Sequence, residues 1–172
     1  MGKGILYGFL FFGAVFVLSF LYLKIKEKAK KEVFFKEQYE MQKKLTENAY
    51  VFHYIGTVEQ IKSALRVRIP TDNSFGANFV GGNFRIKSET ENEIVYFHGA
   101  KITTGGGGDE FTASVKFIHN ENINKVVASI TQWRVKDGVT RKAGIQAMQG
   151  FFNSVSLAVK DVDSNSKLEV VK

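Results

Sequence analysis

Cysteine is absent from the 172 residues of this chain, and proline occurs only once, at Pro70. The absence of thiols excludes disulfides, thiolate metal centres and cysteine nucleophiles. The only histidines are His53, His98 and His119, and they lack the spacing of a metal site, so each is predicted to be a strand or surface residue. A single proline and a hydrophobic fraction of 44% also argue against a disordered chain.

One long apolar run stands near the start of the chain. Residues 4–23 contain no charge and no proline, and a helix over them would be about 30 Å long, the thickness of a bilayer's hydrocarbon core. A signal peptide is less favoured, because the run is long for one and no small-residue cleavage pattern follows it. The sequence therefore predicts an uncleaved, single-pass transmembrane signal anchor over residues 1–23.

Basic residues follow the apolar run, and they bear on orientation and partners. Five lysines lie within eight residues: Lys24, Lys26, Lys28, Lys30 and Lys31. The positive-inside rule then places the rest of the chain on the cytoplasmic side. Residues 1–47 carry nine lysines against five glutamates, which is +4 of the net charge of +7. The lipid bilayer and anionic headgroups near these lysines are thus the predicted partners. Nucleic acid is not, because there is no motif or concentrated basic patch for it.

Residues 24–47 contain neither glycine nor proline, and acidic and basic side chains alternate along them. Glu27 and Lys31, like Glu40 and Lys44, have the i, i+4 spacing that supports an exposed helix. We expect a charged juxtamembrane helix that continues the anchor as a solvated spacer. A short coiled coil and a helix lying on anionic headgroups are the alternatives, but the apolar stripe is narrow for a stable coiled coil.

Residues 48–163 carry the patterns of one soluble α+β domain, and 164–172 read as a polar tail with at most a short strand. Thr57 and Gln60 form a capping-box pattern that predicts a short helix from Val58 to about Arg66. Period-two alternation predicts strands, most clearly over residues 111–117. In the strand expected over 126–135, two alternating sets of apolar residues compete for the inward face. A bulge in the strand would let its two halves face the core with different sets.

The carboxyl-terminal part of the domain predicts a long helix from Arg141 to about Lys160, capped by Thr140. Five large residues fall on one face: Ile145, Met148, Phe152, Val155 and Val159. Five small residues cluster almost opposite: Ala143, Ala147, Gly150, Ser154 and Ala158. The large face should pack on an antiparallel sheet. The small face suggests a second packing surface, either the short helix or another protein chain.

The order of these elements over residues 50–163 is similar to that of helix-grip domains of the START-like kind. That resemblance is an alternative description of the fold. It implies an apolar cavity between the sheet and the long helix, because such domains hold lipids and other apolar ligands there.

A glycine-rich segment carries a second resemblance. The residues Gly107-Gly108-Asp109-Glu110-Phe111 match the five-residue signature of diguanylate cyclases. In that family the glycines let the backbone approach GTP and the acids hold metal. The family's upstream metal-binding aspartate and its long preceding helix are missing from this sequence. A flexible loop over Gly105–Gly108 that enters a strand is therefore the favoured interpretation.

Two other groups of residues are candidate sites. Glu89, Glu91 and Glu93 alternate at a predicted hairpin tip, where solvated acids are favoured over a weak cation site. Trp133, with Tyr96, Phe97 and Phe117, could stack on a ligand, but an aromatic core is the default expectation.

The predicted function is a membrane-anchored, non-catalytic binding or interaction module that holds an apolar ligand or a protein partner. The alternative is a degenerate or atypical enzyme of the diguanylate-cyclase kind. No catalytic, cofactor-binding or metal-ligating residue is predicted.

Overall fold

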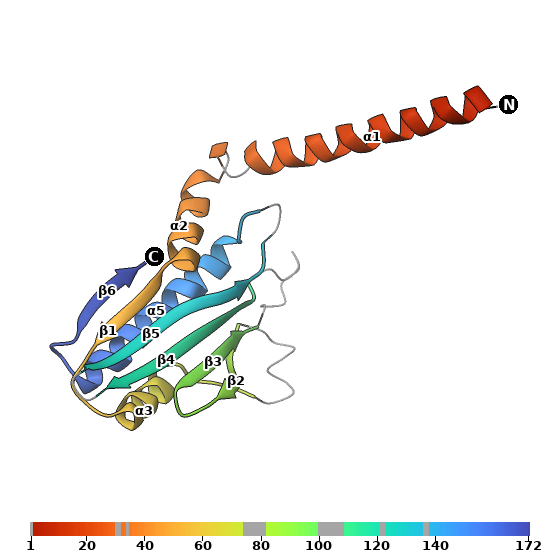
Figure 1. Ribbon diagram of the computed structural model, residues 1–172. Coiled ribbons are helices and arrows are strands. Elements are labelled where there is room, and N and C mark those ends of the chain that lie inside the picture. The colour runs from red at the N-terminus through yellow and green to blue at the C-terminus, as the bar shows by residue number, and fades with distance from the viewer. Residues whose placement is uncertain are drawn as a thin grey trace.

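The computed structural model describes residues 2–29, 32–33, 35–73, 82–99, 109–120, 123–135 and 138–172, with side chains in the first helix from Phe12 onward. The chain forms an α+β fold around a six-stranded antiparallel sheet, with strand order β2-β3-β4-β5-β1-β6 (Figure 1). This confirms the predicted class for the sheet and its long helix. The described elements are, in order, α1 (Gly2–Ala29), α2 (Lys36–Glu47), β1 (Ala49–His53), α3 (Val58–Arg68), β2 (Phe84–Glu89), β3 (Glu93–His98), β4 (Phe111–Asn120), β5 (Ile123–Trp133), α5 (Lys142–Val162) and β6 (Lys167–Val171).

The start of α3 follows from the local sequence, as predicted. The Thr57 side chain accepts a hydrogen bond from the Gln60 backbone N–H, and the Gln60 side chain accepts one from the Thr57 N–H. This capping box satisfies two N–H groups that have no partner within the helix. Gly56, just before the box, has φ +152, and a Cβ there would lie 2.7 Å from Val162 on α5. Glycine is therefore needed for the close approach of this turn to α5.

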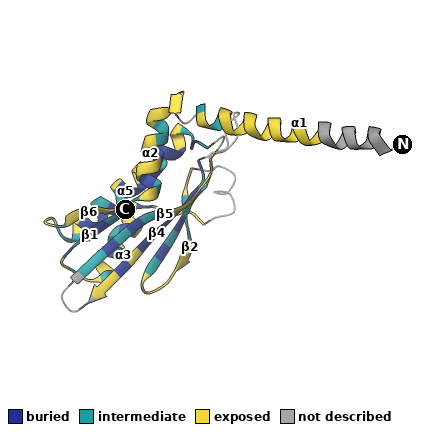
Figure 2. Cartoon of the chain, turned by 45° about the horizontal axis from the view of Figure 1, so that its top comes forward, coloured by how far each residue is buried: buried dark blue, intermediate teal, exposed yellow. Residues whose placement is uncertain are grey.

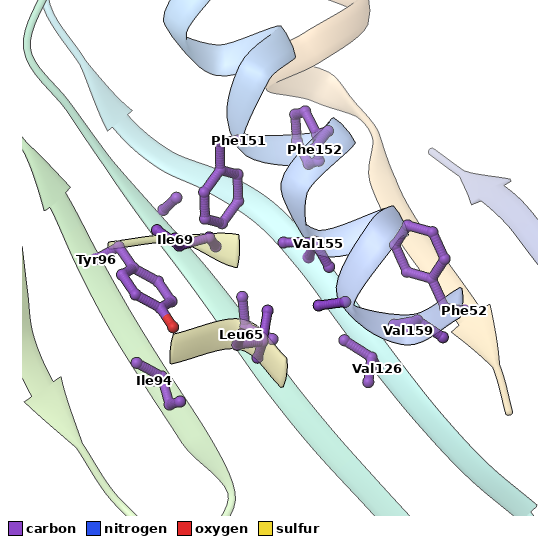
Figure 3. Packing of buried hydrophobic residues seen from close by; sticks show 14 of the residues in the cluster. Phe52, Leu65, Ile69, Ile94, Tyr96, Val126, Phe151, Phe152, Val155 and Val159 are labelled. Carbon is purple, nitrogen blue, oxygen red and sulfur yellow. The ribbon is translucent and has the colours of Figure 1, made fainter. Parts of the chain in front are cut away.

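The core lies between the sheet and helices α3 and α5. All five large residues predicted on one face of α5 are at most 5% exposed, which confirms that prediction. Phe151, which the sequence pattern did not select, is fully buried, and its ring contacts Phe84, Tyr96 and Phe111. Figure 3 shows Phe151 beside Tyr96. The described side chains thus fill the space between helix and sheet where the helix-grip resemblance implies a ligand cavity.

The small-residue face of α5 is covered over part of its length. Helix α3 packs beside α5, where Ala158 is fully buried and Arg68 forms an ion pair with Asp161 at 2.7 Å. Towards the amino-terminal end of α5, Ala143 is exposed, and a Cβ placed on Gly150 would meet nothing within 4 Å. The short helix is therefore the predicted partner for one half of this face only.

The prediction of a membrane span is contradicted. A helix covers residues 4–23, but in the part of the chain that the structure describes, none of the helices combines the length and apolarity needed to cross a membrane. The single-pass anchor, the membrane location and the cytoplasmic orientation are corrected accordingly.

The predicted continuous spacer helix over residues 24–47 is also corrected, because the structure has two helices there. Helix α1 ends at Ala29 and extends away from the sheet, and α2 begins at Lys36 (Figure 1). Helix α2 is not solvated on all sides: Gln42 and Leu45 are 6% exposed, and Leu45 belongs to the core (Figure 2). The headgroup contacts predicted for the lysines after residue 23 stay a prediction.

The segment predicted as a polar tail contains a sheet strand. Strand β6 pairs with β1 from Lys167 opposite His53 to Val171 opposite Ala49. A turn in which Asp163 accepts a hydrogen bond from the Asn165 N–H brings the chain back from α5. The sequence pattern of this strand is short and predicts at most a short strand. Its pairing partner is the backbone of β1, more than a hundred residues earlier in the chain.

Tyr96 offers a test of the core. Its side chain is 1% exposed, its hydroxyl has no hydrogen-bond partner among the described residues, and burial raises its pKa. In Figure 3 this hydroxyl lies among Leu65, Ile69 and Ile94. Because an unpaired buried hydroxyl is costly, Tyr96→Phe is expected to raise the free energy of unfolding by about 1 kcal/mol. Urea denaturation measures this, and a loss of stability would mean that the hydroxyl is bonded in solution.

Candidate binding groove between α2 and β5

A groove of about 530 Å³ lies between α2 and the end of β5. This volume is in the range of small-molecule sites, about 300–1,000 Å³. Its lining contains both apolar and charged side chains, from α1, α2, β5 and the segment after β5: Glu27, Tyr39, Gln42, Lys43, Thr46, Glu47, Gln132, Trp133, Val135 and Gly138.

A bulge in β5 places Trp133 in this groove. Before the bulge, Ile130 pairs with Ala113 and faces the core. After it, Gln132 pairs with Thr112 and Trp133 with Phe111, so Thr131 is the extra residue. The extra residue shifts the alternation by one and turns Trp133 to the sheet face on which Phe111 is buried. The bulge predicted for this strand is thus confirmed.

Trp133 is not part of the aromatic core. Its side chain is 37% exposed, and the adjoining Val135 is 45% exposed. The other aromatic candidates do not lie in this groove. Tyr96 and Phe117 are buried in the core. Phe97 lies on the opposite face of the sheet, where the Arg85 guanidinium is 4.4 Å from its ring centroid. Trp133 instead shares the groove lining with Tyr39 of α2.

Helix α2 is fixed to the domain by two glutamines and one leucine. The Gln42 side-chain oxygen accepts a hydrogen bond of 2.6 Å from the Thr140 N–H, and the Gln38 amide donates to the Thr140 carbonyl. Thr140 is 1% exposed, so these side chains satisfy backbone groups that water does not reach. With Leu45 in the core, the α2 wall of the groove is held in place before any ligand arrives.

The same contacts correct the predicted cap of α5. The residue at the N-cap is Arg141, and no side chain caps this helix. The Thr140 hydroxyl instead donates to the Arg134 carbonyl at 3.3 Å, while its backbone meets α2. The capping pattern was misread because the hydroxyl has a partner outside the helix.

Charged side chains also line the groove that Trp133 and Tyr39 share. Lys43 and Glu47 come from α2, and Glu27 comes from the last turn of α1. Both signs of charge are present within one groove. The arrangement suits a ligand that has an apolar part for Trp133 and Tyr39 and polar groups on either side of it.

The segment that matches the cyclase signature has a structural role where it is described. Gly107 and Gly108, with the rest of Gly105–Gly108, lie outside the described residues. Asp109 is 8% exposed and lies against the first turn of α5, where a Cβ on Gly144 would be 3.2 Å from the Asp109 Cα. Glu110 instead forms an ion pair with Arg134 at 3.1 Å. In the described residues, Asp109 thus packs against α5 and Glu110 pairs with β5's neighbour Arg134.

The histidines are likewise kept apart. His98 is buried, it stacks on Phe111, and burial lowers its pKa despite a hydrogen bond of 3.2 Å to the Asp109 carbonyl. His53 contacts Glu169 at 3.3 Å, and His119 bonds to Asn124. Over the described part of the chain, no three histidine or acidic side chains gather in a way that could hold a metal ion.

Of the three glutamates at the β2–β3 hairpin, two have partners. Glu89 forms an ion pair of 2.8 Å with Arg66, and Glu93 accepts a hydrogen bond from Ser114. Glu91 is exposed in the turn between the strands. The structure thus ties this hairpin to α3 and β4.

Neither a protein-family model nor a curated protein matches this sequence. The groove therefore has to be interpreted from its own chemistry. Sequence reasoning missed it, because its two walls are far apart in the chain. The available signals were Trp133 at the end of an irregular strand and the single apolar stripe of α2.

Proposed function

We propose that this protein is a non-catalytic binding module that holds a segment of a partner protein in the groove between α2 and β5. The observation that supports this proposal is the exposed Trp133, which lines the same groove as Tyr39, in a groove whose α2 wall is anchored. Tryptophan and tyrosine are enriched among residues that dominate binding energy, because they bury a large area with few rotatable bonds.

A polypeptide segment fits this groove better than an apolar ligand. Lys43 and Glu47 line the same groove and would have to lose water against a purely apolar molecule, which is unfavourable. A peptide with one apolar anchor and charged neighbours would pair with them. The space between α5 and the sheet, where an apolar ligand was expected, is filled by side chains. No described cluster of side chains favours the cyclase-like alternative.

The proposal predicts that Trp133 is a dominant contact. Peptides selected from a displayed random library against the full chain should shift the tryptophan emission, and Trp133 is the only tryptophan of the protein. Trp133→Ala should weaken their binding by at least about 2 kcal/mol, roughly 30-fold. Titration calorimetry measures this loss.

The matched control is Ile118→Ala, an apolar residue that is 43% exposed on β4 and does not line the groove. It should leave the affinity unchanged. Selected peptides that bind the Trp133→Ala protein as tightly as the original, or a selection that yields no peptide above background, would contradict the proposed function.

A further inference from the structure

The two edges of the sheet differ in how they are protected. At the β2 edge, the register shifts between Ile86 and Ser88, and the preceding segment covers the start of the strand through a bond from the Asp72 N–H to the Phe84 carbonyl. Bulges and covering segments are ways in which proteins prevent edge-to-edge pairing. This edge is therefore unsuited to adding another strand.

The β6 edge has neither protection. Its register with β1 runs without a shift through five residue pairs, and its far side has no partner strand among the described residues. All five residues of β6 are exposed. A regular strand whose outer N–H and C=O groups lack strand partners is a template for pairing with another chain.

The side chains of β6 add an apolar surface to this edge. Leu168 and Val170 are opposite Phe52 and Tyr50, so they lie on the helix-covered face of the sheet. They remain 52% and 48% exposed. Lys167 and Glu169 lie on the opposite face, next to His53 and Val51. The edge thus presents Leu168 and Val170 on one face, and one charge of each sign together with Val171 on the other.

From this pattern we infer that β6 pairs antiparallel with β6 of a second copy of this chain, with Leu168 opposite Leu168 on the two-fold axis. Directly opposite residues of an antiparallel pair lie on the same face of the sheet. When two identical strands are related by a two-fold axis normal to the sheet, one residue of the strand must therefore lie opposite its own copy. With Leu168 on the axis, each Lys167 faces Glu169 of the second copy, and the apolar Leu168 side chains meet.

The neighbouring registers lack this complementarity. With Glu169 on the axis, two carboxylates would meet, and like charges directly opposite each other are destabilising. With Val170 on the axis, Glu169 would be opposite Val171 and would not face Lys167. The Leu168 register is the one in which both charges of the strand are paired. The product is a continuous sheet across two copies, held by a small interface and hence weakly.

Single cysteines test both the pairing and its register, because the chain has no cysteine of its own. Opposite Cα atoms in an antiparallel pair are about 4.5–5.5 Å apart, within the range that a disulfide spans. Under mild oxidation of the full chain, Leu168→Cys should therefore form a covalent dimer. The matched control, Val170→Cys, is on the same face and about equally exposed, but its two copies would be about 13 Å apart along the strands.

We expect Leu168→Cys to cross-link at least about tenfold faster than Val170→Cys, since a disulfide cannot join Cα atoms more than about 7 Å apart. Lys167→Glu added to Leu168→Cys should slow the cross-linking several-fold, and Lys167→Glu with Glu169→Lys should restore it. Three results would each overturn the inference. The first is an equal cross-linking rate for the two cysteines, and the second is a rate for Leu168→Cys no higher than for Val67→Cys on the exposed side of α3. The third is a cross-linking rate that does not change with the charge substitutions. Any of these would leave the edge to a strand of another protein.

Discussion

Replacing Phe151 by alanine is expected to lower the free energy of unfolding by about 3–5 kcal/mol. The Phe151 side chain is fully buried, and its ring centroid lies 5.8 Å from that of Tyr96 and 5.9 Å from that of Phe84. It therefore joins α5 to both β3 and the edge strand β2. Truncation removes the transfer free energy of the ring, leaves a cavity, and loses aromatic contacts of about 0.5–1.5 kcal/mol each.

Guanidinium or urea denaturation of the full chain measures the loss. Leu157→Ala serves as the control, because Leu157 is on the same helix but 47% exposed. It should change the stability by no more than about 0.5 kcal/mol. If Phe151→Ala cost no more than Leu157→Ala, the packing between α5 and the sheet would not be the main source of stability.

Removing α1 and α2 together is the second change expected to have a large effect. A chain that starts at Asn48 should lose about 2–4.5 kcal/mol relative to the full chain. The loss combines the burial of Leu45, about 1.5–3 kcal/mol, with the net contribution of the hydrogen bond from the Thr140 N–H to Gln42, about 0.5–1.5 kcal/mol. Thr140 is 1% exposed only while α2 covers it, so water bonds to its N–H once α2 is removed.

A chain that starts at Phe35 separates the two helices, because it keeps α2 and lacks α1. It should unfold with the same midpoint and the same cooperativity as the full chain in thermal and urea denaturation. If the chain from Asn48 is as stable as the chain from Phe35, then α2 is a spacer after all, and the groove has only one fixed wall.

The sequence determined the features that depend on neighbours along the chain. The capping box at Thr57 and Gln60 and the large face of α5 are patterns over four and fifteen residues, and both are present as predicted. Alternation over residues 111–117 likewise identified a strand whose apolar side chains face the core. Such patterns suffice because helix hydrogen bonds and side-chain periodicity are local.

The tertiary structure decided what each element does. Gln42 and Thr140 are 98 residues apart, and nothing in the pattern around either of them predicts their hydrogen bond. The same holds for Glu110 and Arg134, which form an ion pair although Glu110 belongs to a segment that matches a cyclase signature. Likewise, the sequence favoured a core position for Trp133, and the side chain is instead 37% exposed in the groove beside α2. Contacts between distant segments depend on how the whole chain packs, and a local pattern carries no information about that packing.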